Sequence, residues 1–270
     1  MFLGLLYETL VRLSAAEGVE EVVLNTGPVQ AKAFGDLRLE LMSGKWPSPV
    51  VKAKVSGSAL ELGFRSRSFW PFSSGALRTI GLEDVPLSGK DIMAMRASGQ
   101  LREAVQGSPG GRLDRYGLSE RFRDSMQGEA FILLADSSAE PAEGGWARDE
   151  RDAFLATLVD DVFGASPGKG RKVRFLIMLT KADGAEAEAE GMLKEICPRT
   201  FEALSKAFSE HGASSDAFTS WVGTEKGAEG LPVPATKVRD GQVQIEYSEK
   251  EYQRLVGRLG KIARSDRRSQ

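Results

Sequence analysis

Hydrophobic positions recur along this chain at two spacings, and the spacing changes from one segment to the next. Apolar residues three or four positions apart, with charged residues opposite, are typical of helices that pack on a core. This spacing predicts helices over residues 2–14, 28–43, 90–105, 118–126, 146–164, 185–211 and 248–264. Gly44 is expected as the C-cap of the second helix, and Ser248 with Glu251 as a capping box of the last.

Shorter apolar runs, bounded by polar or glycine-rich corners, predict strands. We expect strands over residues 52–65, 75–85, 129–136, 173–180 and 214–223. The first two are expected to form a hairpin across residues 69–74. Residues 106–115 and 225–241 are rich in turn-forming residues, and we expect them to be loops.

Apolar strands that alternate with long helices indicate an α/β fold in which helices cover a mostly parallel sheet. We therefore predict a doubly wound, mostly parallel sheet with helices on both faces. Residues 52–85 are expected to supply one antiparallel edge. A single domain is expected over residues 1–270, with loop insertions near 106–120, 137–145 and 224–242.

The composition narrows the classes of function. Hydrophobic residues make up 41% of the chain and charged residues 27%, with a formal net charge of −2. Nucleic acids and anionic membrane surfaces select an excess of Lys and Arg, so we expect neither as a partner. Cys197 and His211 are the single cysteine and histidine, which argues against a zinc site and fits a reducing cytoplasm. No stretch approaches the ~20 apolar residues of a membrane span.

The polar corner after the strand at 173–180 is the first candidate site. In open α/β sheets, ligands bind at the carboxyl ends of the strands. Thr180, Lys181 and Asp183 follow the apolar run FLIML. The carboxylate of Asp183 can accept two N–H bonds from a guanine edge, and the aliphatic stem of Lys181 can lie along the base. The alternative is that Asp183 caps the following helix.

Two further strand ends carry candidate residues. Asp84 lies at the end of the strand at 75–85, where an acidic residue can support Mg²⁺ through its water shell. The alternative for Asp84 is an ordinary loop residue before a proline turn. Ser220 lies at the end of the strand at 214–223, where a backbone group can contact a base oxygen. The alternative for Ser220 is an ordinary turn.

The order of these elements and motifs resembles the Ras-like GTPase domains of the P-loop NTPases. T-K-x-D at 180–183 resembles their base-reading motif, and Asp84 to Gly89 resembles a stretched D-x-x-G. AFILLADSSAE resembles the strand that follows, SGKWPSPV the first switch segment, and FLGLLYETL the helix after the phosphate loop. The resemblance implies GTP or GDP with Mg²⁺ as cofactors, with Ser48 as a weak candidate for the switch hydroxyl on the metal.

The chain departs from that family in its phosphate-binding loop. G-x-x-x-x-G-K-[ST] is absent, although its backbone, lysine and hydroxyl bind the phosphates and Mg²⁺ in the family. One interpretation is that Met1 lies inside a longer domain whose first strand and loop are missing. The other is a pseudo-GTPase that has lost the loop. No catalytic residue is assigned, because no glutamine follows Gly89.

The resemblance implies a guanine-nucleotide-binding molecular switch in a bacterial or archaeal signalling system. Such a switch would act on a protein effector or regulator through residues 44–50 and 84–95, and would bind nucleotide weakly without its phosphate loop. The alternative is a non-catalytic interaction module that docks a partner through aromatic residues in loops, namely Trp46, Phe69, Trp70 and Phe72. A dehydrogenase is disfavoured because G-x-G-x-x-G follows none of the predicted strands.

Overall fold

The structure of the chain is a computed structural model, which describes residues 1–15, 21–24, 27–55, 59–65, 77–83, 128–138, 147–164, 173–182, 188–239 and 241–265. Contacts between residues divide the chain into two compact units. Unit 1 comprises Met1–Pro86 and Val222–Gln270, and unit 2 comprises Leu87–Trp221. The single domain stays a prediction, because contacts alone do not show whether the units fold independently. The predicted helices 90–105 and 118–126 and the loop 106–115 lie outside the described residues.

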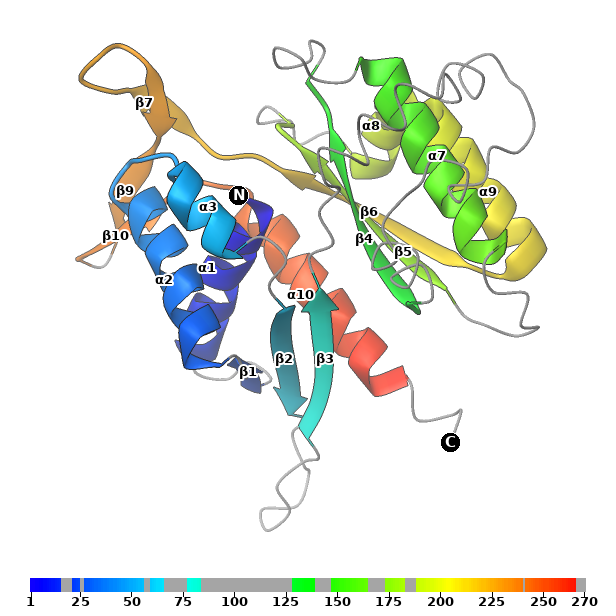
Figure 1. Ribbon diagram of the computed structural model, residues 1–270, viewed down its shortest axis with the longest axis horizontal. Coiled ribbons are helices and arrows are strands. Elements are labelled where there is room, and N and C mark those ends of the chain that lie inside the picture. Colours follow the sequence, from blue (N-terminus) through cyan, green and yellow to red (C-terminus); the bar gives the residue numbers. More distant parts are fainter. Residues whose placement is uncertain are drawn as a thin grey trace. The chain divides into compact units, whose positions relative to one another are not determined.

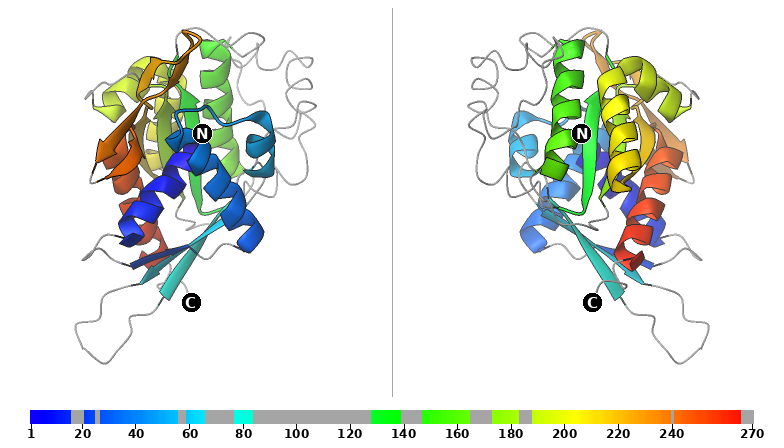
Figure 2. Two further views of the ribbon diagram at one scale, coloured as in Figure 1. Left: turned by 90° about the vertical axis from the view of Figure 1, so that its left-hand side faces the viewer. Right: turned by 90° about the vertical axis from the view of Figure 1, so that its right-hand side faces the viewer.

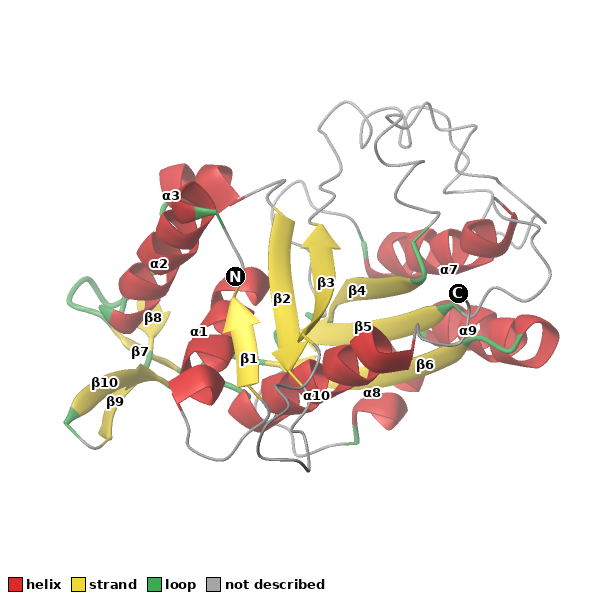
Figure 3. Cartoon of the chain, turned by 90° about the horizontal axis from the view of Figure 1, so that it is seen from below, coloured by secondary structure: helices red, strands yellow, loops and turns green. Residues whose placement is uncertain are grey.

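Unit 1 packs helices around a small antiparallel sheet (Figure 1). Its helices are α1 (Phe2–Ala15), α2 (Pro28–Met42), α3 (Pro49–Val55) and α10 (Glu249–Ser265). Strands β1 (Glu21–Leu24), β2 (Ala59–Arg65) and β3 (Leu77–Glu83) lie side by side in that order (Figure 3). Two antiparallel pairs follow, β7 (Thr224–Lys226) with β8 (Pro232–Pro234) and β9 (Thr236–Arg239) with β10 (Gln242–Ile245).

Unit 2 is built on three parallel strands, β4 (Ala130–Asp136), β5 (Arg174–Thr180) and β6 (Ser214–Ser220). β5 lies between the other two and is buried over five consecutive residues. The helices of this unit are α7 (Arg148–Gly164), α8 (Ala189–Ile196) and α9 (Pro198–His211). α7 and α9 run side by side, as Figure 2 shows, and contact β4 and β6 respectively. They therefore cover one face of the parallel sheet.

The predicted fold class is wrong. The described strands form several small sheets, of which the three-stranded β4–β5–β6 sheet is parallel, and no large doubly wound sheet is present among the described residues. The pair β2 and β3, expected at the edge of the parallel sheet, pairs with β1 instead. The exposure of β3 alternates along the strand, which is typical of an antiparallel sheet with one wet face, whereas β5 is buried throughout its centre.

Several local predictions are confirmed. The helices at 2–14, 28–43, 146–164 and 248–264 appear as α1, α2, α7 and α10, and the expected hairpin appears as β2 and β3. The end of α2 is a Schellman motif, because Gly44 N–H donates to the Leu41 carbonyl and Lys45 N–H to the Glu40 carbonyl. Gly44 has φ +69°, the conformation that this C-cap requires.

Other local predictions are wrong, and prolines explain two of them. Residues 52–55, expected at the start of the strand 52–65, form α3 together with residues 49–51, since Pro49 suits the first turn of a helix. The single helix expected at 185–211 is broken into α8 and α9 at Cys197, because Pro198 disfavours helical geometry in the residue before it. Residues 225–241, expected as a loop, contain β8, β9 and the last two residues of β7.

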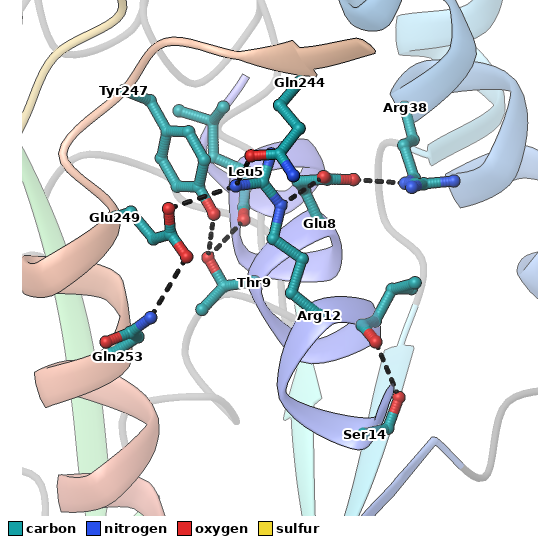
Figure 4. A network of polar contacts seen from close by, with 11 residues as sticks. Leu5, Glu8, Thr9, Arg12, Ser14, Arg38, Gln244, Tyr247, Glu249 and Gln253 are labelled. Atoms are coloured by element: carbon teal, nitrogen blue, oxygen red, sulfur yellow. Dashed lines mark hydrogen bonds and ion pairs between the residues drawn. The ribbon is translucent and has the colours of Figure 1, made fainter. Parts of the chain in front are cut away.

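A partly buried polar network holds α1 against its neighbours in unit 1 (Figure 4). Glu8 on α1 is 1% exposed. Its carboxylate accepts hydrogen bonds from Arg12 Nε at 2.6 Å and from Arg38 Nε of α2. Arg12 Nη1 also donates to Gln244 of β10 at 3.2 Å and to Glu249 of α10 at 3.0 Å. Because each carboxylate pairs with a guanidinium, the charges of the network balance, and its role is to join α1 to its neighbours.

Tyr247 extends this network into the core. The hydroxyl of Thr9 donates its one proton to the Leu5 carbonyl at 2.9 Å. Tyr247 must therefore be the donor in its 2.8 Å contact with Thr9. Tyr247 is 5% exposed, and burial raises the pKa of its phenol to about 12. The folded chain thus holds this proton at a pH where the unfolded chain, with a phenol pKa of about 10, releases it.

Alkaline solution is therefore expected to destabilise the parent chain through Tyr247. A raised folded-state pKa gives stability that is complete below pH ~10 and falls as pH rises toward ~12, by about 2–3 kcal/mol. Tyr247→Phe should cost about 1 kcal/mol at pH 8 through the lost hydrogen bond. Urea unfolding at pH 8 to 12 checks this: the variant should lose less stability than the parent over this range. Equal losses in the two chains would contradict the role given to Tyr247.

Candidate functional site

The carboxyl ends of β4, β5 and β6 meet at one edge of the parallel sheet. The strand register sets Asp136 beside Thr180 and Thr180 beside Ser220. The predicted residues Thr180, Lys181 and Ser220 are therefore brought together, from two strands that are distant in sequence. Asp183 and Asp84 lie outside the described residues, so their predicted roles stay predictions.

Asp136 organises this edge. Its Oδ2 atom lies 2.8 Å from Lys181 Nζ and 3.0 Å from Arg151 Nη1 of α7. Its Oδ1 atom accepts from the backbone N–H and the hydroxyl of Ser138, at 3.0 and 2.7 Å. Burial by itself raises the pKa of Asp136, but the hydrogen bonds from Lys181 and Ser138 outweigh it, and the pKa lies below its ordinary value. Asp136 is therefore held as a carboxylate.

The segment after β5 has an unusual backbone. Lys181 has φ +58°, a left-handed backbone conformation that residues other than glycine rarely adopt. The flanking residues hold it in place: Ser137 donates its N–H and hydroxyl to the Thr180 carbonyl, and Ala182 N–H donates to the Ser220 carbonyl at 3.3 Å. Backbone strain of this kind clusters at ligand sites. It also aims the Lys181 side chain at Asp136.

Ser220 and Ser48 each have a structural role. The Ser220 carbonyl accepts from Ala182, so this residue links the ends of β5 and β6. Ser48 lies in unit 1, where its hydroxyl donates to Glu40 at 3.1 Å and accepts from Val51 N–H at 3.3 Å. It is therefore the N-cap of α3. The Mg²⁺ role of Ser48 stays a prediction, and among the described residues no cluster of three or more His, Cys, Asp or Glu has the arrangement of a metal site.

The aromatic surface proposed for a docking module is described only at Trp46. Its indole N–H donates to the Pro232 carbonyl at 2.8 Å. Trp46 thus has a local partner within unit 1, in β8. Phe69, Trp70 and Phe72 lie outside the described residues.

A cavity of about 130 Å³ lies beside Asp136, between β4 and α7. Its apolar walls come from Leu134, Ala135, Phe154 and Leu155. Arg148, Arg151 and Cys197 complete the lining. The sequence reasoning missed both arginines. Their position was a usable signal, because cations in the first turn of a helix oppose its dipole and need a local reason to be there.

Cys197 is not an activated thiol. It is 3% exposed, and burial, with a further contribution from Asp152, raises the pKa of its thiol to about 11. The carboxylate of Asp152 accepts the N–H groups of Arg199 and Thr200 at 3.0 and 2.9 Å, at the start of α9. The surroundings of Cys197 are therefore those of a structural residue.

Comparisons of the chain with protein-family models, with curated proteins and with solved structures find no match. The likeness to Ras-like GTPase domains stays a prediction. Within the described part of the chain, no helix combines the length and the apolar character needed to cross a bilayer.

Removal of the Asp136 charge is expected to destabilise unit 2. Asp136→Asn leaves Lys181 and Arg151 without their shared carboxylate and should cost about 1–3 kcal/mol at pH 7. A lowered folded-state pKa gives stability that is complete above the unfolded pKa of ~3.9 and is lost as pH falls. Urea unfolding at pH 3 to 7 should therefore show parent and variant converging toward acid pH. A constant difference would contradict the carboxylate role.

Cys197 is expected to react slowly with a thiol reagent. A pKa of about 11 in place of 9.0 lowers the thiolate fraction at pH 8 about a hundredfold. Absorbance during reaction with an aromatic disulfide should show the folded chain reacting at least that much more slowly than the chain in urea. Similar rates in both states would show that Cys197 is accessible and ionised.

Proposed function

We propose that the carboxyl edge of β4, β5 and β6 binds the guanine base of a nucleotide. The observation that supports the proposal is that the three strands end side by side, because Asp136 pairs with Thr180 and Thr180 pairs with Ser220. Ligands of open parallel sheets bind at this edge. The polar residues after β5 and the end of β6 thus lie on two sides of the proposed base-binding site.

Each residue at this edge has a separate part in the proposal. Asp183, one position beyond Ala182 in the sequence, is the acceptor for two guanine N–H groups. Lys181 supplies its aliphatic stem as one wall of the base site. Its ammonium group is already paired with Asp136 at 2.8 Å, which leaves the stem as the part available to a flat, apolar ring face. Ser220 contributes through its backbone, which fixes the segment after β5.

The proposal is limited to base recognition. Mg²⁺ binding through Asp84 and Ser48, switching through residues 44–50 and 84–95, and GTP hydrolysis stay predictions. Action on a protein effector also stays a prediction. A cytoplasmic location is proposed only because the cytoplasm holds the nucleotide pool. Without a phosphate-binding loop, the base alone should give weak binding, because phosphate contacts supply most of the affinity of nucleotide sites.

Titration of the chain with GDP and ADP tests the proposal. We expect GDP to bind at least about tenfold more tightly than ADP, a difference of ~1.4 kcal/mol. Asp183→Asn should bring the ratio of the two dissociation constants to about one, since the amide presents a donor where guanine needs an acceptor. Isothermal titration calorimetry, or competition with a fluorescent nucleotide, measures both constants.

Glu202→Gln is the matched control, because it removes one carboxylate from an exposed position on α9 of the same unit. The control should leave the GDP/ADP ratio unchanged. Equal affinity of the parent for GDP and ADP, or a ratio that survives Asp183→Asn, would refute the proposed base recognition.

A further inference from the structure

Strand β9 leaves one edge of a sheet in unit 1 open for pairing. β9 and β10 form a separate two-stranded antiparallel sheet (Figure 1). The N–H of Glu246 donates to the Ala235 carbonyl at 2.9 Å, and Thr236 and Ile245 are the next pair in register. Hydrogen-bonded pairs alternate with non-bonded pairs in an antiparallel ladder. The N–H and C=O groups of Thr236 and Val238 therefore point away from β10, toward the open edge.

The side chains along this edge are accessible. Val238 is 73% exposed, and Val243, which lies directly opposite on β10, is 42% exposed. These two valines share one face of the sheet, because opposite residues of paired strands point the same way. Lys237 and Arg239 are exposed on the other face. An open strand edge next to exposed apolar side chains can accept a further strand.

The charges of β9 restrict the strand that fits. Lys237 is paired with Glu246, whereas Arg239 has no ion pair within the described part of the chain. Unit 1 carries 19 Lys and Arg and 16 Asp and Glu residues, a formal charge of +3, although the whole chain has a net charge of −2. An acidic side chain opposite Arg239 would therefore meet an unpaired cation in a unit of positive charge.

A second copy of the chain fits this edge poorly. Two β9 strands that pair through their open groups, with Val238 opposite Val238, set Lys237 of one copy opposite Arg239 of the other. Like charges directly opposite each other destabilise a pair of strands. The edge thus favours a strand of different charge.

We propose that β9 binds an extended segment of a partner protein as a third, antiparallel strand. The segment has an acidic residue opposite Arg239 and apolar residues opposite Val238 and Thr236. Backbone hydrogen bonds supply the affinity, and the alternate side chains supply the selectivity. This surface goes beyond the proposed base recognition and does not depend on it, because β9 belongs to unit 1 and the candidate base site to unit 2.

Nuclear magnetic resonance of the amide groups tests the edge in the intact chain. The probe is the blocked hexapeptide acetyl-Ser-Glu-Val-Thr-Val-Ser-amide. In the free chain, the Val238 N–H should exchange with solvent without protection, since it has no acceptor on β10. The probe should shift the amide signals of Thr236 and Val238 along one saturable curve. At saturation it should slow the exchange of both groups at least about tenfold, because each N–H is then hydrogen-bonded.

Two control peptides separate backbone pairing from charge. Proline in place of the first valine removes the N–H that the Val238 carbonyl accepts, and this peptide should produce no saturable shift. Lysine in place of the glutamate should weaken binding at least about threefold, because attraction to Arg239 becomes repulsion. The difference between these two charged peptides should shrink in about 1 M sodium chloride.

Val238→Pro removes a donor from the open edge and leaves the ladder to β10 intact, so this variant should fold and should bind the probe at least about tenfold more weakly. Val243→Pro is the matched control, because its lost N–H points to the opposite edge of the sheet, and it should bind the probe as the parent does. Arg239→Glu should reverse the preference, so that the lysine peptide binds more tightly than the probe.

Four outcomes would overturn the proposal. The Val238 N–H of the free chain could be protected from exchange, which would show that the edge is already paired. The probe could leave the amide signals of β9 in the parent unchanged. Val238→Pro, shown to be folded by circular dichroism, could bind the probe as the parent does. The parent could bind the glutamate and lysine peptides equally, which would reject an acidic strand. A dimer in sedimentation equilibrium that Val238→Pro dissociates would assign the edge to a second copy instead.

Discussion

The pairing of β5 along both of its edges is the constraint on which unit 2 depends. β5 is buried over five consecutive residues, and it is in parallel register with β4 and β6 along its full length. A slip of one residue in this ladder would turn every side chain to the opposite face. Asp136 would then no longer point toward Lys181 and Arg151. The ion pairs at the sheet edge therefore depend on the pairing of β5, and hydrogen bonds of Ser137 and Ala182 hold the left-handed backbone at Lys181.

The local elements could be read from the sequence because their signals are local. β4, β5, α1 and α10 begin and end within one or two residues of the predicted bounds. The assembly of strands into sheets could not be read in this way, because pairing joins segments far apart in the chain. The sequence of β2 and β3 would show the same apolar residues whether these strands paired with β1 or with a parallel strand. It therefore does not identify their neighbour. The alternating exposure of β3, with Leu77, Thr79 and Gly81 exposed and Ile80 half-buried, appears only in the structure.

The candidate site was predictable to a similar extent. The polar residues at the ends of β5 and β6 were identifiable, since ligand-bearing corners follow apolar strands. The partners of these residues were not, because Asp136 and Arg151 belong to other elements and their contact depends on three-dimensional packing. Ser48 is the opposite case. Its hydroxyl was predicted as a metal ligand from the resemblance alone. Ser-Pro is also an ordinary helix start, and the structure shows Ser48 as the N-cap of α3.

Unit 1 is interrupted in sequence by the whole of unit 2, and this nesting has a consequence during synthesis. α1 emerges from the ribosome before α10, against which it packs. At about 5–20 residues per second, synthesis of the chain between the two helices takes roughly 10 to 50 seconds, during which α1 lacks its contact with α10. Phe2, whose ring centroid lies 5.9 Å from that of Tyr252 on α10, is without this contact during that time. The parallel sheet of unit 2 has no such delay, since all its strands lie within one continuous segment.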